Sequence, residues 1–149
     1  MRIAEHKFSF VMRSQWSSSR RLALATLAYA LASLAHHVHN AEYLGAYPNM
    51  PDWLTRAGVY GAWTLVTLVG LAGYLLYRSR YVRSGLVLLA LYAALGLYGL
   101  AHYAVAPPAA HTTAMNLAIG CEVATAVVLL AVVIYAARRQ FRVSVASVD

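Results

Sequence analysis

The stretch that decides the fold is residues 113–137, TAMNLAIGCEVATAVVLLAVVIYAA, which is apolar almost throughout and carries one charged side chain, Glu122. An α-helix rises 1.5 Å per residue, so about 20 such residues cross the roughly 30 Å hydrocarbon layer of a bilayer. Three other stretches are long and apolar enough for the same purpose, at residues 22–44, 57–77 and 86–105. The sequence therefore predicts four transmembrane helices.

The composition of the whole chain supports this interpretation. Its 149 residues are 61% apolar and 11% charged, whereas soluble domains are about 45–50% apolar and about 25% charged. These values exclude a disordered chain and the usual soluble classes, and the length is too short for two domains. Because the apolar stretches lack the two-residue alternation of a membrane barrel, we predict an all-α, integral membrane four-helix bundle over residues 22–137.

Basic residues fall almost entirely on one side of this predicted bundle. Eleven of the twelve Arg and Lys residues lie in the N-terminal segment 1–21, in the loop 78–83, or in the tail 138–149, and the twelfth is Arg56. The positive-inside rule then places both termini in the cytoplasm. With four spans, we expect a multi-pass membrane protein whose histidine-rich end lies on the outer side. The expected partners of these basic residues are anionic lipid headgroups rather than nucleic acid.

Most of the ionisable side chains inside the bundle are predicted near its outer end. Five of the six histidines belong to this group: His36, His37, His39, His102 and His111. The helical rise places His36 roughly 9 Å, His102 about 5–6 Å and Glu122 about 13 Å below the outer boundary of the hydrocarbon. Since ionisable groups at such depth usually face the bundle interior, we predict one polar site there.

Helical phase divides the histidines of the first span. His36, His39 and Asn40 follow the spacing i, i+3, i+4 and share one stripe. His37 is rotated by about 100° from His36, so we expect it to point away from the site.

The chemistry that best suits this set is metal binding. Neutral imidazole is the commonest metal ligand in proteins, and imidazole with carboxylate suits Cu, Zn or Fe. Helix bundles build metal sites in this way from side chains on facing helices. We expect four ligands and three secondary candidates; the ligands are His36, His39, His102 and Glu122, and the secondary candidates are Glu42, His111 and Asn40.

Other functions fit the same residues. Haem b, with His36 and His102 as axial ligands, is less favoured because the histidines gather at one face of the membrane. Glu122 could serve as the catalytic acid of an enzyme that performs acid–base chemistry on a lipid or isoprenoid. The protein could also be a noncatalytic accessory subunit of a larger membrane complex, or a homo-oligomer. The single cysteine and the lack of HExxH or phosphate-loop motifs leave open whether the protein is an enzyme.

Overall fold

The computed structural model describes the backbone of residues 2–145 and the side chains of residues 19–140. In this part of the chain all regular secondary structure is helical, as predicted. The α-helices are α1 (Arg2–Glu42), α2 (Arg56–Arg78), α3 (Val82–Gly96), α4 (Ala101–Val105) and α5 (Thr113–Val145). Three short 3-10 helices connect them: η1 (Leu44–Ala46), η2 (Leu97–Leu100) and η3 (Pro108–Ala110).

Four helical stretches are long and apolar enough to cross a membrane, which confirms the number predicted from the sequence. They are Ser19–Glu42, Arg56–Arg78, Val82–Val105 and Thr113–Gln140. The third stretch runs through α3, η2 and α4 without leaving helical geometry. Helices α1 and α5 continue beyond their apolar portions into the basic segments near the two ends of the chain.

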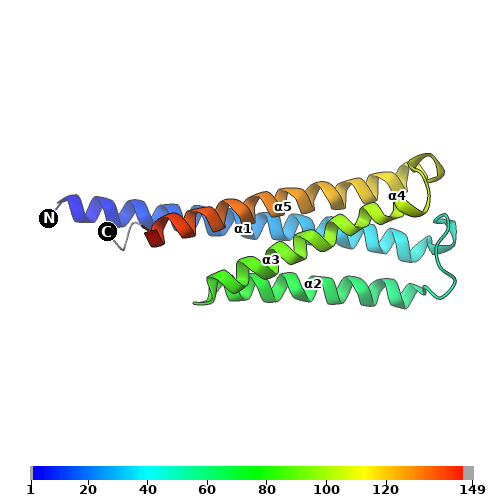
Figure 1. Cartoon of the computed structure of the whole chain (residues 1–149), viewed down its shortest axis with the longest axis horizontal. Helices are drawn as coiled ribbons and strands as arrows, with labels where there is room; N and C mark the ends of the chain where they lie inside the picture. The colour runs from blue at the N-terminus through cyan, green and yellow to red at the C-terminus, as the bar shows by residue number, and fades with distance from the viewer. Residues whose placement is uncertain (1, 146–149) are drawn as a thin grey trace.

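The helices form an elongated bundle (Figure 1). Helices α1 and α5 lie side by side, and α3 packs against both α5 and α2. Both termini lie at one end of the bundle, and the connections 43–55 and 106–112 lie at the other end. This arrangement brings together the portions of α1, α4 and α5 near these connections, and these portions carry the polar residues singled out from the sequence.

The bundle has an apolar interior and an apolar exterior. Fully buried side chains such as Tyr29, Leu89 and Leu129 form the core, while large side chains such as Leu65 and Val87 are more than 60% exposed. An outward-facing apolar surface would be costly in water but suits a helix that faces lipid.

Small residues let the helices approach one another closely. A Cβ atom at Gly70 would lie 2.5 Å from the Tyr92 ring, and one at Gly96 would lie 2.5 Å from the Tyr29 hydroxyl. Glycine at these positions therefore allows α2 and α1 to pack against the third span, as is common between membrane helices.

Candidate metal centre

The centre of the polar site is a contact between His36 on α1 and Glu122 on α5. The His36 Nδ1 atom and the Glu122 Oε2 atom form a hydrogen bond. Both side chains are almost completely buried, with 4% and 3% of their surface exposed. The two residues are 86 positions apart in sequence, and they meet because α1 and α5 pack along much of their length.

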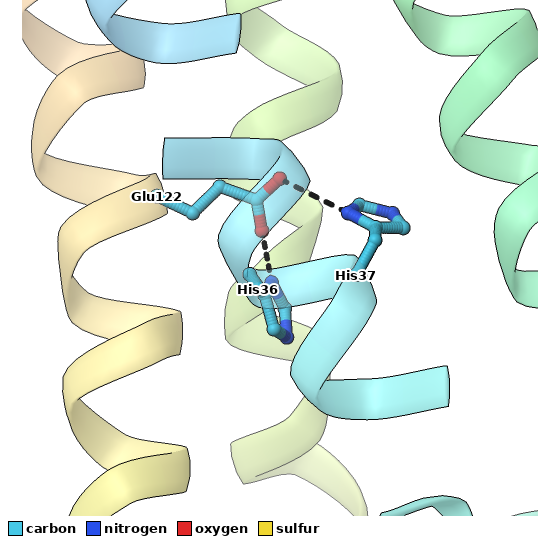
Figure 2. A group of neighbouring side chains, drawn as sticks. All are labelled: His36, His37 and Glu122. Atoms are coloured by element: carbon cyan, nitrogen blue, oxygen red, sulfur yellow. Dashed lines mark hydrogen bonds and ion pairs between the residues drawn. The ribbon is translucent and has the colours of Figure 1, made fainter. Parts of the chain in front are cut away.

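His37 also reaches this carboxylate. Its Nδ1 atom lies 3.8 Å from Glu122 Oε1, so the two imidazoles flank the carboxylate, one at each oxygen (Figure 2). The expectation that His37 points away is wrong, because the extended Glu122 side chain reaches between the directions in which the two neighbouring histidines project. One ligand atom from each of these three residues lies within 4.8 Å of the other two.

His102 on α4 completes the deep part of the site. Its ring centroid lies 5.3 Å from that of His36, with the rings edge to face, and its Nε2 atom lies 3.4 Å from Asn40 Nδ2. Gly99 makes room beside them, since a Cβ atom there would lie 3.1 Å from Glu122 Oε2. The structure thus brings together four of the residues that the sequence predicted: His36, Asn40, His102 and Glu122.

His39 and His111 lie closer to the end of the bundle than His36 does, around Tyr47 of the connection 43–55. The His39 Nδ1 atom is 2.9 Å from the Tyr47 hydroxyl, and the Tyr47 ring centroid lies 5.1 Å from that of His102 and 6.4 Å from that of His111. Burial raises the pKa of Tyr47 to about 12, so its hydroxyl stays neutral. Sequence reasoning missed Tyr47, because only folding of the connection 43–55 over the bundle end brings it to the histidines.

His111 is held by the connection on which it lies. Its Nδ1 atom is 3.1 Å from the carbonyl oxygen of Pro107. Asn116 on α5 secures the same connection: its Nδ2 atom donates to the Pro108 carbonyl at 3.0 Å, and its Oδ1 atom accepts from the Tyr103 hydroxyl at 2.8 Å. Asn116 therefore has a structural role, and the His111 ring has a defined direction.

Glu42 is not part of this cluster. Its carboxylate pairs with Arg56 at the start of α2 and accepts a 2.8 Å hydrogen bond from the Tyr60 hydroxyl. The Arg56 and Glu42 side chains are 62% and 39% exposed. The sequence suggested Glu42 as a secondary ligand, but the connection 43–55 brings the start of α2 beside the end of α1 and gives Glu42 other partners.

Comparison with known protein families, curated proteins and solved structures finds no match for this chain. The function therefore has to be argued from the site itself, because a four-helix bundle is compatible with many functions.

Proposed function

We propose that this chain is a multi-pass membrane protein that binds a transition-metal ion, namely copper, zinc or iron, among the histidines at one end of its helix bundle. The observation that carries the proposal is the buried cluster of His36, His37 and Glu122, whose ligand atoms lie within 4.8 Å of one another. The His102 ring adjoins it. Imidazole and carboxylate together form a donor set that suits these metals.

The cost of burial supports a functional site. A carboxylate and several imidazoles inside an apolar bundle are expensive, and such groups in membrane proteins usually mark ion, proton or ligand sites. A structural contact between α1 and α5 would need one hydrogen-bonded pair. Instead, His102 and Asn40 lie next to His36 and Glu122, with His111 farther out.

The charge distribution supports an orientation for the site. The termini and the turn between α2 and α3 lie at one end of the bundle, away from the connections 43–55 and 106–112 (Figure 1). Eleven of the twelve basic residues belong to segments at that end. By the positive-inside rule this end is cytoplasmic, in contact with anionic lipid headgroups, and the histidine cluster lies in the outer half of the membrane.

The haem alternative has less support from the geometry. The His36 and His102 rings pack edge to face with centroids 5.3 Å apart, which is a direct aromatic contact. A macrocycle bound by both side chains would have to separate them.

An acid–base enzyme acting on a lipid or isoprenoid is the second candidate, and one observation favours it. An apolar groove of about 270 Å³ lies between α1, α2 and α3, and its lining includes Leu27, Leu71 and Tyr92. The Tyr92 ring packs against Tyr29, with centroids 4.4 Å apart, and Tyr29 is seven residues, or about two helical turns, before His36. A prenyl or acyl chain in this groove would lie against α1, the helix that carries His36, while Glu122 reaches His36 from α5.

Metal analysis of the protein purified in mild detergent, without a polyhistidine tag, tests the proposal. We expect about one metal ion per chain in the wild type, loss of the metal in His36→Ala, and retention in Glu42→Gln. The Glu42→Gln variant is the control because it changes a carboxylate at the same end of the bundle but outside the cluster. A wild-type protein that neither contains nor takes up Cu, Zn or Fe would refute the proposal, and a haem absorption band would support the haem alternative.

A further inference from the structure

Three buried polar atoms beside the cluster have no hydrogen-bond partner: His36 Nε2, Asn40 Oδ1 and His111 Nε2. The three residues are 3%, 7% and 6% exposed. Buried polar atoms are nearly always hydrogen-bonded, because a buried atom without a partner has lost its bonds to water and gained nothing in return. The three residues all adjoin the His102 ring, so their unpartnered atoms require an explanation.

The hydrogen bonds on the other side of each ring show that the two imidazole atoms are acceptors. With Glu122 as the carboxylate, it accepts a hydrogen bond from His36 Nδ1, and the Pro107 carbonyl, which can only accept, takes one from His111 Nδ1. A neutral imidazole has one N–H group, so each Nε2 atom carries a lone pair. Asn40 Oδ1 is an acceptor as well. The long 3.4 Å contact between Asn40 Nδ2 and His102 Nε2 is one that a metal ion on His102 Nε2 would replace. A bound water molecule or a cation would satisfy these three acceptors, and imidazole nitrogens are a donor set that suits a transition-metal ion.

We propose that the metal ion binds on the Nε2 side of His36, held by the imidazoles of His36, His102 and His111. In this arrangement Glu122 is a positioning residue that acts through His36. The inference rests on the proposal that this end of the bundle binds a metal, but it moves the ion from the cluster of His36, His37 and Glu122 to the opposite side of the His36 ring. It also excludes His37, although His37 lies nearer to Glu122 than His111 does.

The ring positions approach those around a shared ion, but among the described residues only His36, His37 and Glu122 already have ligand atoms within 4.8 Å of one another. With metal–nitrogen bonds of about 2.0–2.1 Å and tetrahedral geometry, two imidazoles on one ion have centroids about 5 Å apart. The His36 and His102 centroids are 5.3 Å apart. The His102 and His111 centroids are 6.2 Å apart, so these rings have to approach by about 1 Å. A shift of the connection 106–112 as a unit would provide this and keep the hydrogen bond between His111 and Pro107.

Binding on the Nδ1 side, between His36, His37 and Glu122, would conflict with the existing hydrogen bonds. The His37 Nδ1 atom lies 2.8 Å from the Ser33 carbonyl and donates to it, so it has no lone pair to offer. A metal on His36 Nδ1 would also move the hydrogen to Nε2, which is buried and has no acceptor. Binding through Nε2 keeps both hydrogen bonds and produces the carboxylate–histidine–metal arrangement that is common in metalloproteins.

Titration of the metal-free, full-length protein with Cu²⁺ in mild detergent tests the assignment, with pulsed EPR to count the bound imidazoles. The matched variants are His111→Gln and His37→Gln, each of which replaces one imidazole by an amide. We expect His111→Gln to weaken Cu²⁺ binding by more than about 100-fold, and His37→Gln to change it by less than about threefold. Glu122→Gln should weaken binding by about 10–100-fold, because it removes the residue that hydrogen-bonds the metal-binding His36. The number of bound imidazoles should stay at three.

The outcomes separate the two proposals. Loss of binding in His37→Gln and Glu122→Gln, with normal binding in His111→Gln, would overturn the ligand assignment and leave the metal proposal standing. Absence of tight Cu²⁺, Zn²⁺ or Fe²⁺ binding by the wild type would overturn the metal proposal itself. If His111→Gln does not fold, the wild-type EPR count decides, because the inference requires three imidazoles and the Nδ1 site provides two.

Discussion

Gly96 offers a test of how the packing of α1 against the third span supports the site. An alanine Cβ atom at position 96 would lie 2.5 Å from the Tyr29 hydroxyl and 2.6 Å from two ring carbons. Ordinary contacts lie at 3.4–4 Å, so the two segments have to separate by about 1 Å. Tyr29 cannot easily move away, because it is fully buried and its ring packs against Tyr92.

The magnitude follows from two opposing effects. Overpacking of a well-packed core costs about 1–3 kcal/mol, and replacing glycine by alanine in a helix gains about 1 kcal/mol. Gly120→Ala is the control, because a Cβ atom at that position of α5 has no neighbour within 4 Å. We expect Gly96→Ala to be about 1–3 kcal/mol less stable than Gly120→Ala, since both variants share the gain in helix propensity.

Unfolding in detergent, followed by circular dichroism, measures this difference, and Cu²⁺ titration measures its effect on the site. Residue 96 lies about two helical turns from His102, so separation there should increase the 5.3 Å distance between the His36 and His102 rings and weaken metal binding. Equal stability of the two variants, together with unchanged binding, would refute the close packing of Tyr29 against this glycine.

Two further predictions concern orientation and alkaline pH. In a background without the native cysteine, single cysteines introduced at Asn49 and Ser144 should react with a membrane-impermeant reagent from opposite sides, the one at position 49 from outside; reaction from the same side would contradict the topology. Because burial raises the pKa of Tyr47 from 10 to about 12, its contribution to folding stability is fully present below pH 10 and is lost as the pH rises from 10 to 12. Tyr47→Phe should therefore lose less stability than the wild type over this range in detergent unfolding curves, and parallel curves would count against a buried Tyr47.

The sequence was sufficient to predict the four spans because length and apolarity are local properties. A segment that can cross the hydrocarbon must be helical, so the number of spans did not depend on knowing their contacts. Helical phase also placed His36 and Asn40 on one face of α1, and both are buried beside His102.

The residues that sequence reasoning misplaced depend on contacts between segments. Glu42 lies one turn beyond His39 in the sequence, but Arg56 and Tyr60 lie close enough to pair with it. Tyr47 becomes part of the site because its connection folds inward. His37 meets Glu122 because a long carboxylate side chain can reach beyond the face on which it begins. Each of these contacts depends on how the helices assemble into the bundle, and the periodicity within a single helix carries no information about that assembly.

The metal proposal also has to be weighed against other buried polar atoms in the same bundle. Four more of them lack partners: the hydroxyls of Tyr29, Thr67 and Tyr92 and the indole nitrogen of Trp63. Hydroxyls can donate, and an indole nitrogen can only donate, so these atoms would be satisfied by an acceptor, such as the carbonyl oxygen of a lipid. Thr67 and Tyr92 line the apolar groove. The atoms around His102 are acceptors on rings already oriented by Glu122 and Pro107. This chemical difference, more than the number of unpartnered atoms, supports a cation at the histidine cluster and, in the groove, a ligand such as a lipid that joins an apolar chain to an acceptor oxygen.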